Sequence, residues 1–255
     1  MQGDSIYQNE RENEILKILV SENYATVKQL SQWLYTSEAS IRRDLKSLEQ
    51  RGIVKRSYGG AELTKNSSQI LPFSERAHRN VAAKKIIAKK AIPFIREGDI
   101  VFLDQSSSSY YIAAELLKIS NVTVVTNNIE ILTLLSQSNL PVIASGGHLS
   151  KSNRNCLYGT DAQRIFSEVR ADIMFFSANS LASDGIIYDC DREEICLRNV
   201  MLANARKKVF LCTTDKYGHA SGYKQCLISQ IDQIITDGTD KELFHELNNY
   251  NEIII

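Results

Sequence analysis

The stretch Tyr35-Thr36-Ser37-Glu38-Ala39-Ser40-Ile41-Arg42-Arg43-Asp44-Leu45 predicts a turn followed by a helix with one apolar and one basic face. Ser37 can cap this helix, because its hydroxyl can accept a hydrogen bond from a free N–H group of the first turn. Apolar residues recur at positions i, i+4 and i+7, as Ile41, Leu45 and Leu48. The helix is expected to run from Ser37 to Arg51 and to end at Gly52 in the left-handed conformation. Its basic side chains lie off the apolar face, where the major groove of DNA could accept them.

The segments on either side predict the rest of a small DNA-binding domain. A first helix is expected over residues 8–22 and is broken by Asn23-Tyr24-Ala25. Thr26 can cap a second helix, whose apolar face is formed by Val27, Leu30 and Leu34. Residues 53–60 form a short β-like run that ends in two glycines. Three short helices followed by a β-wing are typical of a winged helix-turn-helix.

Local charge supports DNA binding by this segment. The whole chain has 30 basic and 30 acidic residues, so only a local cluster can attract a polyanion. Between Arg42 and Arg56, six basic residues stand against Asp44 and Glu49. The alternatives are a solvated helix face for the arginines and a charge-protected edge strand for Lys55 and Arg56. We expect contacts to double-stranded operator DNA from Thr26, Lys28, Ser37, Glu38, Ser40, Arg42, Arg43, Lys46, Arg56 and Tyr58.

Composition excludes several other classes of protein. The chain has 255 residues, of which 43% are hydrophobic, enough for one large or two modest domains. Its five cysteines form no C-x-x-C pair and its four histidines are not at ligand spacing from them, which predicts reduced thiols and no metal site. No signal pattern and no membrane-spanning apolar run is present, so a cytoplasmic protein is expected. We expect no cofactor.

A second domain is predicted after a polar linker at residues 63–74. A helix with a run of basic residues is expected from about residue 75 to 95, and this run could extend the DNA-binding surface or form a solvated face. From residue 98, short β-rich runs alternate with helical segments, which predicts an α/β fold with a mostly parallel sheet. The strands are expected near residues 100–103, 122–125, 142–144, 173–176, 208–212, 234–235 and 253–255, and the helices near 109–118, 129–137, 160–168, 194–205 and 240–247.

Small and polar residues follow the predicted strands, where an open α/β sheet binds its ligands. Ser106 to Ser109 also lead into a helix, and a helix N-terminus is suited to a phosphate group. Ordinary loops between strands and helices have similar composition, so each loop alone is a weak signal. Together they predict an effector site at Asp104, Ser106, Ser107, Ser108, Thr126, Asn127, Gly146, Gly147, Arg198 and Lys216.

The spacing of several motifs resembles the DeoR family of bacterial transcription regulators. In the first domain these motifs are Ser37-x-x-Ser40-Ile41-Arg42-Arg43-Asp44-Leu45, Leu48-Glu49-x-x-Gly52 and Arg56-x-Tyr58-Gly59-Gly60-Ala61. In the second they include Gly98-Asp99-x-Val101-Phe102-Leu103-Asp104, Val125-Thr126-Asn127, Leu157-Tyr158-Gly159 and Lys216-Tyr217-Gly218. The resemblance implies a winged helix-turn-helix over residues 7–62 and an effector-binding and oligomerisation domain over 75–255, with a fold similar to ribose-5-phosphate isomerase. It implies a repressor of sugar or carbohydrate metabolism genes that binds a phosphorylated sugar and forms a dimer or tetramer.

The chain departs from the family pattern in the predicted effector site. The usual Asp-x-Gly-Thr-Thr loop reads Asp104-Gln105-Ser106-Ser107-Ser108, Thr213 replaces an aspartate, and Arg198 stands where a lysine is usual. The site could therefore bind a different phosphorylated ligand, bind weakly, or have lost its ligand, in which case the domain would serve only in oligomerisation. An isomerase-like enzyme with Asp104 as the base is a further alternative. We expect no enzyme, because the sequence offers no pairing of a carboxylate and a histidine as acid and base.

Overall fold

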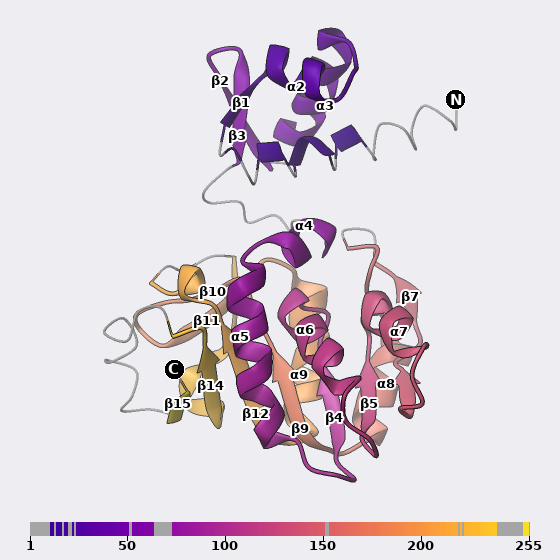
Figure 1. Ribbon diagram of the computed structural model, residues 1–255. Coiled ribbons are helices and arrows are strands. Elements are labelled where there is room, and N and C mark those ends of the chain that lie inside the picture. Colours follow the sequence, from indigo (N-terminus) through magenta and orange to yellow (C-terminus); the bar gives the residue numbers. More distant parts are fainter. Residues whose placement is uncertain are drawn as a thin grey trace. The chain divides into compact units, whose positions relative to one another are not determined.

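The computed structural model describes residues 11–12, 14–16, 18–19, 22, 24–50, 53–63, 73–150, 153–218, 220, 222–238 and 252–254. It divides the chain into two compact units, Met1–Arg79 and Asn80–Ile255 (Figure 1). We describe each unit by itself. The sequence predictions for residues 8–10, Gly52 and residues 240–247 lie outside the described residues.

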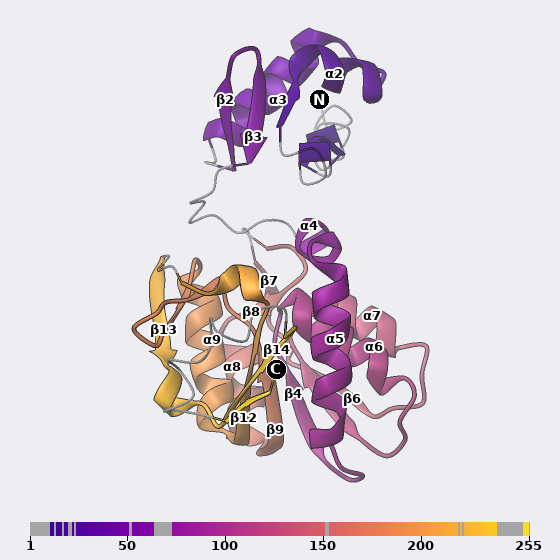
Figure 2. The ribbon, with the colours of Figure 1, turned by 60° about the vertical axis from the view of Figure 1, so that its left-hand side comes forward.

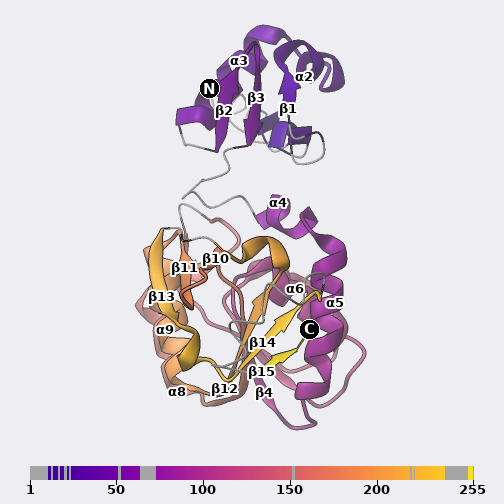
Figure 3. The same ribbon diagram turned by 90° about the vertical axis from the view of Figure 1, so that its left-hand side faces the viewer.

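The first unit contains the predicted helices and wing. The described residues between Arg11 and Glu22 are helical, and they are followed by α2 (Val27–Trp33) and α3 (Glu38–Gln50). The wing is a hairpin of β2 (Val54–Ser57) and β3 (Gly60–Leu63). Within the segment predicted to break the first helix, Tyr24 and Ala25 belong to a short strand, β1 (Tyr24–Thr26), which pairs antiparallel with β3 (Figure 3). The three predicted residues of the α3 apolar face are all buried in one core with Ile15 and Leu30.

The prediction of one continuous helix from residue 75 to 95 is wrong. It divides into α4 (Phe73–His78), α5 (Val81–Ala91) and the 3-10 turn η1 (Ile92–Phe94). The break falls at Asn80, which has a φ of 53° in the left-handed region, a conformation that asparagine adopts more readily than most residues. The basic run is not one solvated face either. Lys84 is buried, and the ammonium of Lys90 donates to the carbonyl oxygen of Thr236 at 3.0 Å.

The second unit is built on a parallel sheet of seven strands, which confirms the predicted α/β fold. The strand order is β15-β14-β12-β9-β4-β5-β6, and every pair is parallel. In chain order the strands are β4 (Ile100–Leu103), β5 (Thr123–Thr126), β6 (Val142–Ala144), β9 (Ala171–Phe176), β12 (Ala205–Cys212), β14 (Gln233–Thr236) and β15 (Glu252–Ile254).

Helices cover both faces of this sheet (Figure 2). On one face lie α5, α6 (Ser107–Leu116) and α7 (Ile129–Leu135), and on the other lie α8 (Thr160–Glu168) and α9 (Arg192–Ala203). Side chains alternate between the two cores along each strand. In β4, Val101 and Leu103 join the α5–α7 core, whereas Phe102 joins the α8–α9 core and meets Phe166 edge to face.

In the described part of the second unit, five short strands outside the parallel sheet were not predicted. The hairpin of β7 (His148–Leu149) and β8 (Leu157–Tyr158) precedes α8. A small antiparallel sheet consists of β10 (Ser180–Leu181), β11 (Ile186–Asp189) and β13 (Tyr223–Leu227), and it lies beside α9 (Figure 3). This small sheet matters for function, because it supplies two partners of Arg198.

Candidate functional site

Helix α3 presents a polar and basic face to solvent. Its N-terminus is capped as predicted, since the backbone N–H of Ser40 donates to the Ser37 hydroxyl at 3.2 Å. The two serine hydroxyls also lie 3.0 Å apart and share a hydrogen bond. The Arg42 guanidinium donates to the Glu38 carboxylate at 2.9 Å, one turn away on the exposed face. Arg43 and Lys46 are exposed as well.

Asp44 has a structural role in this motif. Its carboxylate is fully buried and accepts from the Arg11 guanidinium through both oxygens, with Nη2 3.1 Å from Oδ1. This pair joins α3 to the first helix. The two arginines before Asp44 therefore remain exposed while the aspartate holds the helix in place.

The remaining predicted DNA contacts lie at the start of α2 and in the wing. Thr26 and Gln29 form a reciprocal capping box, in which the Thr26 hydroxyl accepts from the Gln29 N–H at 3.2 Å. Lys28 is exposed on the first turn of this helix. In the wing, Arg56 lies 3.6 Å from the Glu49 carboxylate, so its charge is partly matched. Tyr58 is fully exposed at the wing turn with a φ of 42°.

The structure also shows an exposed aromatic residue in the turn before α3 that the sequence analysis did not include among the DNA contacts. Tyr35 is 97% exposed in the turn before α3 and has a φ of 49°. A tyrosine with positive φ is uncommon, and a turn between two helices was the only signal for it.

In the second unit, Asp104 is the centre of a buried polar network at the carboxyl end of β4. Its side chain accepts from the N–H of Ser106 at 3.1 Å, the N–H of Ser177 at 3.3 Å and the hydroxyl of Ser109 at 2.6 Å. It also accepts from Nε of Arg198 at 3.2 Å. Both carboxylate oxygens are therefore occupied by donors from the protein.

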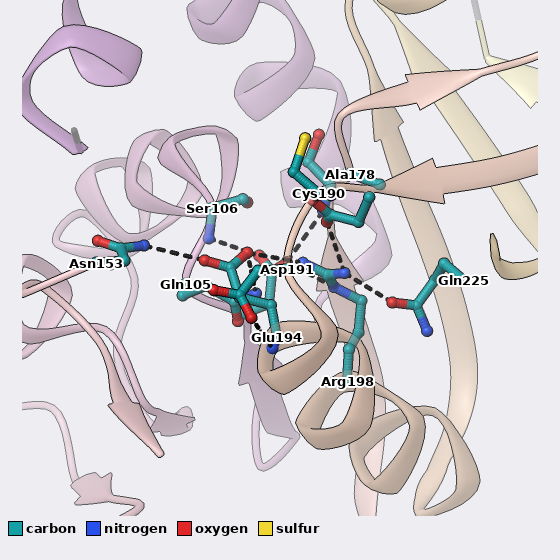
Figure 4. Close-up of polar contacts among 12 residues, drawn as sticks. Gln105, Ser106, Asn153, Ala178, Cys190, Asp191, Glu194, Arg198 and Gln225 are labelled. Carbon is teal, nitrogen blue, oxygen red and sulfur yellow. Dashed lines mark hydrogen bonds and ion pairs between the residues drawn. The ribbon is translucent and has the colours of Figure 1, made fainter. Parts of the chain in front are cut away.

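Arg198 does not point its charge into solvent or an open site. Its side chain is 1% exposed, and Nη1 donates to Asp189 at 2.8 Å and to Gln225 at 2.7 Å (Figure 4). Asp189 ends β11 and Gln225 lies in β13, so the small antiparallel sheet holds the guanidinium. Three surrounding carboxylates outweigh the desolvation of the guanidinium and raise the pKa of Arg198. Burial is the main cause that raises the pKa of Asp189.

Glu194 extends this network toward the β4–α6 loop. Its carboxylate accepts from Gln105 Nε2 at 2.9 Å and from Asn153 Nδ2 at 3.1 Å, as Figure 4 shows, and it lies 3.7 Å from Nη2 of Arg198. Sequence reasoning missed these residues, as it missed Asp189 and Gln225. The spacing of Glu194 and Arg198 by four residues in a helix was an available signal, whereas Asn153 and Gln225 had none.

The serine run forms the N-terminus of α6. Ser106 is the N-cap, and its hydroxyl accepts from the Ser109 N–H at 3.1 Å. Ser108 is buried, and its hydroxyl has no hydrogen-bond partner in the described part of the chain. Across the sheet edge, Thr126 accepts from the Asn128 N–H at 3.1 Å, and Asn127 lies next to Gln105. These predicted residues therefore lie around one sheet edge.

Of the remaining predicted effector residues, Lys216 contacts the residues after β9, whereas Gly146 and Gly147 lie in the turn before β7. The Lys216 ammonium donates to the Ser177 hydroxyl at 2.6 Å and to the Ala178 carbonyl oxygen at 2.8 Å. Gly146 and Gly147 form the turn into β7 with φ of 68° and 98°. A Cβ on Gly147 would lie 2.1 Å from the carbonyl oxygen of Tyr158, so this glycine permits close packing of the β7–β8 hairpin.

A separate cleft of about 250 Å³ lies between the start of α8 and the start of α9. Its lining includes His148, Gln163, Arg192 and Cys196 but none of the predicted effector residues. Tyr158 lies at its wall, where burial and nearby carboxylates raise the pKa of its hydroxyl.

The described residues hold no cluster of histidine, cysteine, aspartate and glutamate side chains suited to a metal ion. The five cysteines are all free thiols, and burial raises the pKa of Cys212 to about 12 and of Cys226 to about 11. Within the same described ranges, the helices are all too short or too polar to cross a membrane.

Comparison with known proteins gives a consistent result over both units. Residues 11–67 match the family described as DeoR-like helix-turn-helix domain, and residues 79–238 match the DeoR C terminal sensor domain. The HTH-type transcriptional regulator GolR of Listeria innocua is 32% identical, covering 89% of this chain and 90% of that protein. The Glycerol-3-phosphate regulon repressor of Escherichia coli is 28% identical over 90% of this chain and 91% of that protein. The Lactose phosphotransferase system repressor of Staphylococcus epidermidis is 26% identical over 96% of this chain and 98% of that protein.

Solved structures with similarity to this chain include ribose 5-phosphate isomerase from Methanocaldococcus jannaschii, at 18% identity and a TM-score of 0.39 over 52% of this chain and 53% of that chain. Another is eIF2B beta from Chaetomium thermophilum, at 12% identity and a TM-score of 0.46 over 95% of this chain and 83% of that chain. The family matches and the GolR relative together cover both units described above. This chain belongs to the DeoR family of transcriptional regulators.

Proposed function

We propose that this protein represses genes of sugar or carbohydrate metabolism by placing α3 in the major groove of operator DNA. One observation carries this proposal. Arg42 and Arg43 are exposed on α3, whereas Asp44 of the same motif is buried against Arg11. The arginines are thus available to bind DNA, and arginine is the side chain that pairs best with guanine.

The same surface offers contacts to the DNA backbone. Lys28 at the start of α2 and Arg56 in the wing supply positive charge, and Tyr58 projects from the wing turn. Ser37 and Ser40 lie at the N-terminal end of α3, where a recognition helix approaches the bases. Glu38 holds Arg42 by an ion pair and would orient it toward a base.

The effector proposed for the second unit is a phosphorylated sugar. Its phosphate would bind at the N-terminus of α6, where free first-turn N–H groups and the Ser108 hydroxyl, which has no partner among the described residues, are donors. Ser106 caps this helix with its own side chain, so a serine is compatible with the position where the family usually has glycine. Lys216 would add positive charge.

Effector binding would control DNA binding by favouring one arrangement of a dimer or tetramer in the cytoplasm, because one head reads only half of a palindromic operator. An alternative is that the second unit only assembles the oligomer. Its support is the departure of the β4–α6 loop from the family pattern.

Enzymatic activity is not part of this proposal. A general base needs a free acceptor at the reacting carbon, and Asp104 already accepts from four donors of the protein. Incubation with ribose 5-phosphate and with hexose phosphates should give no aldose–ketose conversion.

The DNA-binding proposal is tested with duplexes that the wild-type chain selects from a random pool. At fixed salt, Arg42→Ala should weaken binding to the selected duplex by about 1–3 kcal/mol and affect a scrambled duplex less, because a base contact carries the specificity. Arg164→Ala is the matched control, since Arg164 is an exposed arginine on α8. Equal affinity of Arg42→Ala and wild type for the selected duplex would remove Arg42 from the base contacts.

The effector proposal is tested by thermal unfolding of the full chain with hexose, pentose and polyol phosphates. A bound effector should raise the unfolding temperature of the second unit by an amount that grows with its concentration. Ser108→Ala should reduce this increase. The oligomerisation-only alternative predicts no shift with any compound.

A further inference from the structure

The turn of the wing has a backbone conformation that its sequence does not favour. Tyr58 and Gly59 join β2 to β3 as a two-residue loop, and their φ values are 42° and 80°. Positive φ at both positions is the pattern of a type I′ turn, whose first position favours asparagine, aspartate or glycine. A tyrosine in the left-handed region is disfavoured, and the Tyr58 side chain is fully exposed, so burial does not offset this cost. Contacts from other elements are therefore needed to hold the turn.

The start of α2 and the strand before it supply these contacts. The Tyr24 hydroxyl donates a shared hydrogen bond to the carbonyl oxygens of Ser57 and Tyr58, at 3.1 and 3.3 Å. The N–H of Val27, the first residue of α2, donates to the carbonyl oxygen of Gly59 at 2.9 Å. Three successive carbonyl groups of the wing turn thus accept from β1 and α2, and β1 itself pairs with β3 (Figure 3).

The ring of Tyr24 is fitted to the same hairpin. A Cβ on Gly60 would lie 2.6 Å from the Tyr24 hydroxyl oxygen and 2.7 Å from Cζ, so the ring passes close to this glycine. Gly60 pairs with Ser57 at the end of the hairpin and with Thr26 of β1. Because Gly60 has no side chain, the Tyr24 hydroxyl has room to reach the turn.

We infer that Tyr24 is a positioning residue for DNA binding, whose hydroxyl holds the wing turn in the conformation that presents Tyr58 to the DNA backbone. This inference rests on the proposed function, in which the wing contacts operator DNA. A loop that is ordered only on binding costs affinity, whereas a loop that is already held avoids this cost. The same contacts join the wing to the start of α2, so Lys28 and Tyr58 meet the backbone as parts of one surface.

The test compares full-length wild type and Tyr24→Phe on the selected duplex and on a scrambled duplex at fixed salt. Phenylalanine keeps the ring beside Gly60 and removes only the hydroxyl. Binding should weaken about three- to tenfold, as expected for one hydrogen bond, and by the same factor on both duplexes, because a backbone contact is independent of sequence. Tyr223→Phe is the matched control at an exposed tyrosine of β13 in the second unit, and it should bind like wild type.

A second background separates positioning from a general loss of stability. Tyr58→Gly removes the side chain proposed to contact DNA and gives the turn a residue that adopts positive φ freely. In this background, Tyr24→Phe should change the affinity by less than about 1.5-fold, because the turn no longer depends on the hydroxyl. All binding is measured below the unfolding transition that Trp33 fluorescence reports, so partial unfolding does not enter the comparison.

The outcomes distinguish this inference from the proposed function. If wild type prefers the selected duplex and Tyr24→Phe binds both duplexes as wild type does, the inference alone is overturned. An equal loss from Tyr24→Phe in the wild-type and Tyr58→Gly backgrounds, or a loss confined to the selected duplex, also overturns it. If wild type binds no duplex, both are overturned.

Discussion

Replacement of Arg198 by methionine tests the central network of the second unit. Methionine keeps much of the length of the arginine stem and its contact with Phe176, over whose ring the guanidinium lies at 5.9 Å. It removes the cation that serves Asp104, Asp189 and Glu194. Three buried carboxylates then lose the cation that they share.

The expected cost follows from the burial of these groups. Removal of one partner from a buried ion pair typically destabilises a protein by about 3–5 kcal/mol, and here the side chain is 1% exposed. The second unit covers residues 80–255. For a unit of this size, such a change lowers the unfolding temperature by about 6–20 °C at neutral pH. The loss should shrink as the pH falls, because burial raises the pKa of Asp189 and its protonation removes a charge that Arg198 no longer pairs.

Circular dichroism and tryptophan fluorescence separate the two units in this measurement. Trp33 is the only tryptophan of the chain and lies in the first unit, so its fluorescence should report an unchanged transition. Arg206→Met is the matched control, because Arg206 pairs with Asp172 at 3.2 Å while its side chain is 72% exposed. An exposed pair contributes about 1 kcal/mol or less. A loss from Arg198→Met no larger than that from Arg206→Met would refute the reasoning about the buried network.

Three further substitutions test other parts of the structure. Asp44→Asn should destabilise the first unit by about 1–3 kcal/mol and so lower the midpoint of the Trp33 fluorescence transition, because it removes the buried charge that pairs with Arg11. Gly147→Ala should destabilise the second unit by at least about 2 kcal/mol and Gly146→Ala by about 1 kcal/mol, since both have positive φ but only the first would clash with a carbonyl oxygen. Asp189→Asn should raise the thermal stability at pH 7. The folded pKa of Asp189 is raised, so its ionised form costs stability that the neutral amide avoids, and the difference should vanish near its unfolded pKa of about 3.9.

Each of these three has a contradicting result. If Asp44→Asn left the midpoint of the Trp33 fluorescence transition unchanged, the ion pair of Asp44 with Arg11 would not stabilise the first unit. Equal losses from the two glycine substitutions would remove the argument from the close approach to Tyr158. A lower unfolding temperature for Asp189→Asn at pH 7 would show that the ion pair with Arg198 outweighs the desolvation of Asp189.

Local patterns accounted for most of the secondary structure. The apolar spacing of Ile41, Leu45 and Leu48 predicts α3 because a helix brings such residues to one face, and all three are buried. Strands of the parallel sheet are continuous apolar runs because both faces are covered, and β4 and β9 were recognised for this reason. The break at Asn80 was missed, since the residues on both sides favour a helix and only Arg79 and the left-handed Asn80 separate the two helices.

Partners of the buried charges depended on the tertiary structure. Arg198 was expected to face an anion, but in the structure its guanidinium is held by Asp189 of β11 and Gln225 of β13, two strands that were not predicted. The pairing of Asp44 with Arg11 likewise joins residues 33 positions apart, and no local spacing indicates it.

The sequence by itself determined that the chain has a capped, basic recognition helix with a wing and a parallel α/β domain, because these features depend on periodicity and on the chemistry of neighbouring residues. Only the tertiary structure decided which charged side chains are exposed and which are buried with partners. Arg42 and Arg43 remain exposed, whereas Asp44, Asp104 and Arg198 are buried with partners from distant segments. Whether a charged residue binds a ligand or stabilises the fold depends on the groups that reach it in space, and these come from elements that meet only after the chain has folded.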